Sequence, residues 1–203
     1  MAVVFAVGCK KRKEEAPVPL VPSAGSAGSA GSAGSAAAAA PTLTDPQIAA
    51  IVVAANQVDI DAGQLALSRS KNAEVKKFAE RMVTDHGAVI KAATDLVTKL
   101  GVTPEQSDMS KDLVAGGADA RAQFEKLDGD AFDRAYVDNE VAYHEAVIDA
   151  LKSQLIPSAS NEELKKTLVG VQPAFDAHLA HARQVQAALA GDGSAAPAHA
   201  HAP

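Results

Sequence analysis

The stretch VKKFAERMVTDHGAVIKAATDLVTKL, residues 75–100, decides the fold class of this chain. Its apolar residues are spaced alternately four and three apart, which places them on one stripe of an α-helix that faces a partner helix. The stripe consists of Val75, Ala79, Met82, His86, Val89, Ala93, Leu96 and Leu100. The segment therefore predicts a long amphipathic helix with a histidine near the middle of its apolar stripe.

The same spacing recurs in three other segments, so the whole fold is expected to be all-α. The stripe of the first helix consists of Ile48, Ile51, Ala55, Val58, Ala62 and Leu65. The stripes of two later helices consist of Val137, Val141, His144, Ile148, Leu151 and Leu155, and of Leu164, Leu168, Val171, Phe175, His178, Ala182, Val185 and Leu189.

Capping and breaking residues set the boundaries of the first two helices. Thr44 or Asp45 can cap the first helix, with Pro46 at its first position, and the helix is expected to end near Ser70. The second helix ends at Leu100-Gly101. Because only a few residues separate the two helices, they are expected to form an antiparallel hairpin.

The second half of the chain predicts another hairpin. One long helix follows Asp128-Gly129-Asp130 and runs to about Leu155, where Pro157 breaks it, and Asn161 caps the last helix, which ends before Gly191. Residues 101–129 form a long connection with a helix of its own, at about Ser110 to Leu127, which Gly116-Gly117 interrupts. Two antiparallel hairpins joined by a long crossover containing a short helix predict a ferritin-like four-helix bundle over residues 45–191.

The flanking segments predict an exported, lipid-anchored protein. Residues 1–9, an apolar run that ends in Gly8-Cys9, resemble a truncated lipoprotein-type signal segment, in which Cys9 carries the lipid. The alternative is a short apolar N-terminus with a free thiol. Residues 10–44 are a flexible linker that is basic at first and then rich in Pro, Ala, Gly and Ser, and residues 192–203 are a disordered tail.

Charge and composition limit the partners. The net charge of −6 argues against nucleic acid, because phosphate binding needs a basic surface. The partner expected from the sequence is a membrane, reached through the lipid anchor, and the protein partner stays unspecified. The expected location is the periplasm, with the outer membrane favoured for the anchor.

Three histidines predict a polar layer or a metal site inside the bundle. His86, His144 and His178 lie on apolar stripes near the midpoints of three helices, and Asp59 lies beside the stripe of the fourth. Imidazoles and a carboxylate suit a single divalent metal ion such as Zn, Fe, Mn or Cu. Further candidates, as additional ligands or as groups that orient an imidazole, are Asp85, Glu140 and His181.

A structural role for the same histidines stays open. A buried histidine can be satisfied by a hydrogen bond, with Asp59, Tyr136 or Tyr143 as partner, and a polar layer can fix helix register. The di-iron pattern of ferritin-like bundles needs Glu three residues before a ligand histidine, whereas this chain has Val141 and Phe175 there. Iron oxidation at a two-metal carboxylate site is therefore not expected.

Several of these residues also resemble a known family. The stretch from Val75 to His86, Phe132-Asp133 with Tyr136 followed by His144, and Pro173 followed by His178-Leu179 are similar to the bacterial family called domain of unknown function 4142. Asp59-Ile60 with Gly63 lies where that family usually has Glu, Ile and Gly. The resemblance covers about residues 45–190, and it implies a ferritin-like helical fold and an outer membrane or other envelope location. It implies no established activity.

Two functions remain from the sequence. The first is a lipid-anchored envelope protein whose bundle binds a metal ion through Asp59, His86, His144 and His178. The second is a structural or interaction module whose core histidines only pack and hydrogen-bond. An enzymatic role is not favoured, because it needs an open coordination position and a cleft that a sequence does not show.

Overall fold

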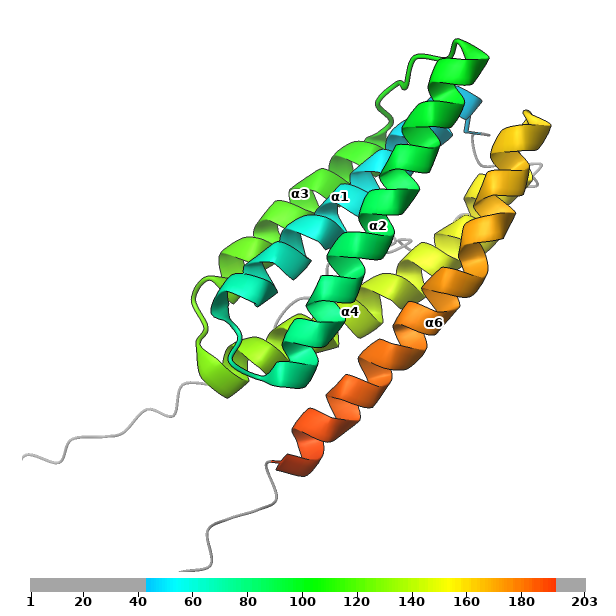
Figure 1. The fold of residues 1–203 in the computed structure, drawn as a ribbon. Helices are drawn as coiled ribbons and strands as arrows, with labels where there is room; N and C mark the ends of the chain where they lie inside the picture. The colour runs from blue at the N-terminus through cyan, green and yellow to red at the C-terminus, as the bar shows by residue number, and fades with distance from the viewer. Residues whose placement is uncertain (1–42, 193–203) are drawn as a thin grey trace, which may run out of the picture.

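The computed structural model describes residues 43–192, which are helical almost throughout and contain no strand (Figure 1). The all-α prediction is confirmed. The signal segment with Cys9, nearly all of the linker and all but the first residue of the tail lie outside the described residues, and that first residue, Asp192, is the last of a helix. The long helices are α1 (Asp45–Arg69), α2 (Ala73–Leu100), α3 (Asp108–Phe124), α4 (Gly129–Ala150) and α6 (Glu162–Asp192), and a π-helical turn η1 (Leu151–Leu155) and the short α5 (Ile156–Ser158) follow α4 directly.

Local capping explains where α1 and α2 begin and end. The Thr44 side chain accepts a hydrogen bond from the Gln47 backbone, and the Gln47 side chain accepts one from the Thr44 backbone, which forms a capping box. The Asn72 side chain caps α2 by accepting hydrogen bonds from the backbone of Glu74 and Val75. Gly101 ends α2 with a φ of 64°, a left-handed conformation that glycine adopts at little cost.

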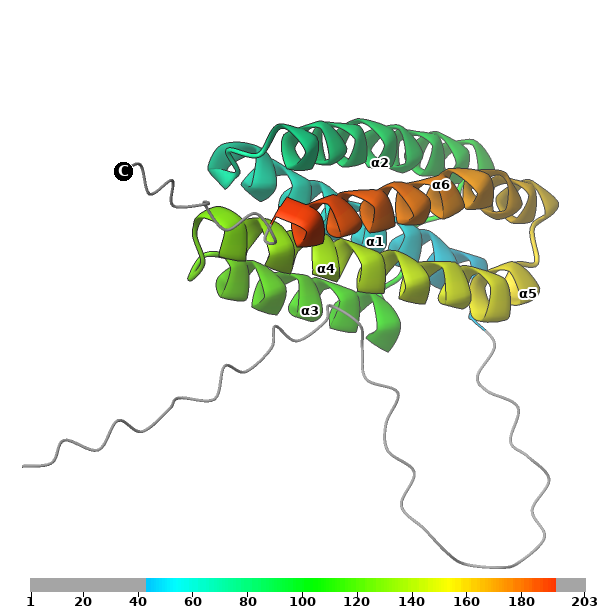
Figure 2. The same ribbon diagram turned by 90° about the horizontal axis from the view of Figure 1, so that it is seen from below.

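Four of the five long helices form two antiparallel pairs around one core. α1 pairs with α2 and α4 pairs with α6, while α2 also contacts α6 and α1 also contacts α4 (Figures 1 and 2). The connection between the pairs carries α3, which runs back along the molecule beside α1. This arrangement brings the middles of α1, α2, α4 and α6 to the same level of the bundle.

The expected break at Gly116-Gly117 is wrong, because α3 is continuous from Asp108 to Phe124. A Cβ atom at Gly117 would lie 2.7 Å from Val58 Cγ2, closer than two carbon atoms can pack. Gly117 therefore lets α3 approach α1 closely, and its role is in packing rather than in ending a helix.

The expected end of the third long helix near Leu155 is also too early. The helical path continues through the π-helical turn to Ser158, so Pro157 lies in its last turn, and the chain becomes extended only at Ala159. Asn161 caps α6 as predicted, since its side chain accepts hydrogen bonds from the backbone of Glu163 and Leu164. Pro157 therefore does not end the helix but lies within its last residues.

The two ends of the bundle are packed differently. At the end where α2 and α4 begin, the aromatic rings of Phe78, Phe124, Phe132 and Tyr136 are fully buried against one another. Toward the other end, the stripe residues Val89, Leu96 and Leu100 of α2 are only half-buried. Among the described helices, none has an apolar stretch long enough to cross a membrane.

Candidate metal site

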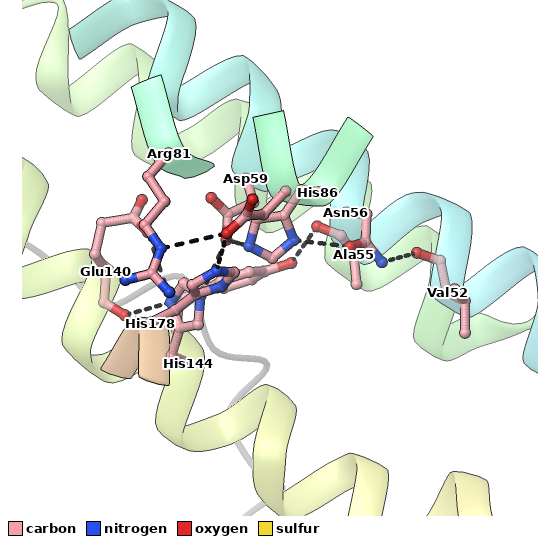
Figure 3. Close-up of polar contacts among 11 residues, drawn as sticks. Val52, Ala55, Asn56, Asp59, Arg81, His86, Glu140, His144 and His178 are labelled. Carbon is pink, nitrogen blue, oxygen red and sulfur yellow. Dashed lines mark hydrogen bonds and ion pairs between the residues drawn. The ribbon is translucent and has the colours of Figure 1, made fainter. Parts of the chain in front are cut away.

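Each of the helices α1, α2, α4 and α6 contributes one side chain to a buried polar cluster at mid-height. These are Asp59, His86, His144 and His178, and none is more than 3% exposed (Figure 3). The ring centroids of the histidines are 5.1 to 5.6 Å apart. One nitrogen of each ring lies within 4.8 Å of one nitrogen of each of the other two. The structure therefore brings together the residues that the apolar stripes singled out.

Asp59 lies between two of the imidazoles. Its Oδ2 atom is 3.1 Å from His86 Nε2 and 3.5 Å from His144 Nε2. Both distances are within the range of an ion pair, yet neither contact is a hydrogen bond. Within the described residues, neither carboxylate oxygen and neither Nε2 atom has a hydrogen-bond partner. Unpaired polar atoms inside a protein are costly, so this group needs a further explanation.

The proton on His86 is fixed by Asn56. The Asn56 side-chain nitrogen donates to the Val52 carbonyl at 2.7 Å, so its oxygen is left to face His86 Nδ1, also at 2.7 Å. An amide oxygen only accepts, so His86 Nδ1 must carry the hydrogen. The lone pair of neutral His86 is therefore on Nε2 and points at Asp59.

His144 is oriented in the same sense by its own helix. Its Nδ1 atom is 2.9 Å from the Glu140 carbonyl oxygen, which again can only accept a hydrogen bond. The hydrogen is thus on Nδ1, and the lone pair on Nε2 faces Asp59. Two imidazole lone pairs and a carboxylate are directed at one small region of the core.

His178 is oriented by a carboxylate at the surface. Its Nε2 atom is 2.8 Å from Asp85 Oδ2, and Arg81 Nε donates to the same oxygen at 3.3 Å. Burial raises the pKa of Asp85, but the hydrogen bonds from His178 and Arg81 outweigh it and lower the pKa overall. Asp85 therefore stays ionised and accepts from His178 Nε2, which leaves the lone pair on Nδ1, a buried atom without a partner in the described residues.

Burial also makes the cluster electrically neutral. It lowers the pKa of His86 to about 2 and that of His144 to about 4, and it raises the pKa of Asp59 to about 8. Burial and then the charge of Asp59 raise the pKa of Glu140 well above its usual range. These shifts favour uncharged imidazoles and a protonated Asp59 at pH 7, and the raised pKa of Glu140 likewise favours its protonated form.

Of the remaining ligand candidates from the sequence, Glu140 lies beside the cluster and His181 does not. Glu140 is buried, and one of its oxygens groups with Asp59 and His144 within 4.8 Å. His181 is in neither compact group of ligand atoms and instead packs edge-on against Phe78, with ring centroids 5.2 Å apart. The sequence reading missed Asn56, although a polar residue one turn before Asp59 on the same face of α1 was a usable signal.

A small cavity adjoins the cluster. Its volume is about 10 Å³, close to the smallest space that can hold one water molecule. Asp59, His86 and His144 line one side of it, and Asn56, Tyr143 and Phe175 are among its other lining residues. The Tyr143 hydroxyl donates its hydrogen to the Ala55 carbonyl at 2.8 Å, so it cannot donate a hydrogen bond to the cluster.

The chain belongs to the family described as Domain of unknown function (DUF4142), whose profile matches residues 30–185. The family resemblance seen in the sequence is thereby confirmed. Neither a curated protein nor a solved structure matches the chain.

Proposed function

We propose that this protein binds one divalent transition-metal ion at Asp59, His86, His144 and His178. One observation carries the proposal: the lone-pair nitrogen of each histidine and both oxygens of Asp59 are buried without hydrogen-bond partners in the described residues. The other nitrogen of each ring is already held by Asn56, the Glu140 carbonyl or Asp85. Metal-ligating histidines are typically oriented in this way.

The donor set and its spacing suit such an ion. Two donors about 2.1 Å from one ion are at most about 4.2 Å apart. One nitrogen of each imidazole lies within 4.8 Å of one nitrogen of each of the other two, so small shifts would bring the three histidines onto one ion. Asp59 is outside this compact group, but its Oδ2 atom is 3.1 Å from His86 Nε2 and 3.5 Å from His144 Nε2, which places it beside the same ion. A nitrogen-rich set with one carboxylate suits Zn, Fe, Mn or Cu rather than Mg or Ca, and Glu140 is placed to add a second oxygen.

A layer of packed, uncharged histidines explains the cluster less well. Protonated Asp59 has a single hydrogen to donate, whereas His86 Nε2 and His144 Nε2 both face it as acceptors. His178 Nδ1 remains unpaired in either case. Such a layer would leave at least two buried lone pairs unsatisfied, whereas one bound cation would satisfy them together.

Titration of the metal-stripped full-length protein with Co²⁺ and Zn²⁺ tests the proposal. We expect one ion per chain, with the Co²⁺ absorption of a nitrogen-rich site. His144→Ala should abolish stoichiometric binding, whereas His181→Ala removes a nearby histidine outside the cluster and should leave binding unchanged. Absence of binding, or equal losses in the two variants, would refute the metal site and leave the structural or interaction module.

We also propose that the fold is ferritin-like and that the protein is exported and lipid-anchored in the bacterial envelope. Two antiparallel helix pairs joined by a long connection support the first part. The Gly8-Cys9 junction and the flexible composition of residues 10–44 support the second. Mass spectrometry of the mature protein should find a diacylglyceryl group on Cys9, since stable anchoring needs more than one acyl chain. A mature N-terminus elsewhere would contradict the anchor.

A further inference from the structure

A large apolar cavity occupies the half of the bundle in which α2 and α4 end. Its volume is about 260 Å³, and its walls come from α1, α2, α3, α4, the π-helical turn and α6. Protein interiors contain few spaces larger than a water molecule, and an apolar cavity of about 150 Å³ already binds benzene. A cavity of this size can therefore take up a small organic molecule.

Small residues and the π-helical turn create this space. Ala93 on α2 and Ala146 and Ala150 on α4 line the cavity where larger side chains would fill it. The π-helical turn supplies Leu151 and Leu155 to the wall. Such turns inside α-helices occur frequently at functional sites. The exposed residues Ala92, Asp149 and Gln154 are also in the lining, so the cavity reaches the surface.

The cavity adjoins the candidate metal site. Five residues line both this cavity and the small one beside the cluster, namely Ala55, Asn56, Tyr143, Val147 and Phe175. The small cavity is lined in addition by Asp59, His86 and His144. Phe175 stacks on His86 with ring centroids 5.3 Å apart, so the inner wall of the apolar space is also the packing surface of a cluster histidine.

The lining also restricts the charge of an occupant. Most of it consists of aliphatic side chains, and it contains no Lys, Arg or His. Its one charged residue, Asp149, is exposed at the rim. An anionic group inside the cavity would lose its hydration without gaining a cationic partner, which is costly. An uncharged molecule avoids this cost.

We propose that the cavity binds an uncharged, mainly aliphatic small molecule, one end of which lies against the histidine cluster. Binding in the cavity is independent of the metal site, whereas the approach of this molecule to a metal ion rests on the proposed function. The ligand enters where Asp149 and Gln154 lie, and its inner end reaches the wall formed by Tyr143 and Phe175.

Calorimetric titration of the metal-free full-length protein with 1-alkanols from butanol to decanol tests binding. Each added methylene should lower the dissociation constant about fourfold until the chain fills the cavity, because burying a methylene is favourable by a nearly constant amount. Octanoate, matched in length to 1-octanol but charged, should bind at least tenfold more weakly. An affinity that does not rise with chain length, or that is equal for octanol and octanoate, would overturn the proposal.

Substitutions locate the ligand. Ala93→Leu and Ala150→Leu extend side chains into the cavity and should each weaken octanol binding at least tenfold, whereas Ala177→Leu on the exposed face of α6 should not. All three variants should keep the Co²⁺ binding of the wild type, which separates a failure here from a failure of the metal site. Octanol binding that survives both cavity substitutions contradicts the assignment.

Nuclear magnetic resonance of the metal-free protein tests the position of the inner end. Octanol should shift the ring resonances of His86 and His144, because these rings line the adjoining small cavity. The resonances of His181 should stay in place, since this residue lines neither cavity. Saturable binding without a change at His86 and His144 would remove the link between the cavity and the cluster.

Discussion

Replacing Asp59 by asparagine should make the metal-free protein less sensitive to pH. Burial raises the pKa of Asp59 to about 8, whereas the unfolded chain releases this proton near 3.8. Between these values the folded state holds one more proton than the unfolded state, so stability falls as pH rises. Asparagine resembles the protonated carboxyl group in size and charge, but it cannot ionise.

The magnitude follows from the proton difference. One proton corresponds to about 1.4 kcal/mol per pH unit, and Asp59 is half ionised at pH 8, so the wild type should lose roughly 1.6 kcal/mol relative to Asp59→Asn between pH 6.5 and 8. Burial also raises the pKa of Glu140, so a rise in pH lowers the stability of the wild type and of Asp59→Asn alike through this residue. His86 and His144, whose pKa values burial lowers, have an opposite effect only below about pH 6.5, where the unfolded chain protonates them.

Urea unfolding in the presence of a chelator, at several values between pH 6.5 and 8, measures this difference. Asp95→Asn removes an exposed carboxylate from α2 and should give a curve parallel to that of the wild type. If Asp59→Asn is also parallel to the wild type, Asp59 is ionised in the folded protein throughout this range. The uncharged cluster inferred here would then be wrong, and a positive charge would have to lie beside Asp59.

The remaining predictions concern packing and the metal site. Gly117→Ala should destabilise the protein by roughly 1–3 kcal/mol in thermal unfolding, since its Cβ atom would lie 2.7 Å from Val58. Gly170→Ala, which has open space around it, should stabilise the protein by about 0.5–1 kcal/mol. If Gly170→Ala were the less stable of the two variants, the close packing of α3 on α1 would be contradicted. Asn56→Leu should weaken Zn²⁺ binding about 10–100-fold in calorimetry, because it frees the orientation of His86, and an unchanged affinity would deny Asn56 that role. The affinity for Zn²⁺ should rise about tenfold per pH unit up to about pH 8 and then level off, because binding displaces the proton of Asp59; a midpoint near pH 6.5 would instead indicate that histidine protons compete.

Local signals explain what could be predicted. The spacing of apolar residues identified the helices, because a helix turn fixes which residues share a face whatever packs against it. Caps such as Thr44 and Asn161 act within one turn, so the helix starts were readable from the chain. Gly117 could not be explained in this way, because the residue that leaves no room for a Cβ atom there is Val58, which is far away in sequence.

The sequence by itself determined that His86, His144 and His178 face the core near the middle of their helices, with Asp59 close to the same level. Only the tertiary structure decided which nitrogen of each ring keeps its lone pair, because the protons are placed by Asn56, the Glu140 carbonyl and Asp85. It alone also shows the apolar cavity beside them. A cavity depends on how several helices are spaced relative to one another, and no single segment of sequence encodes that spacing.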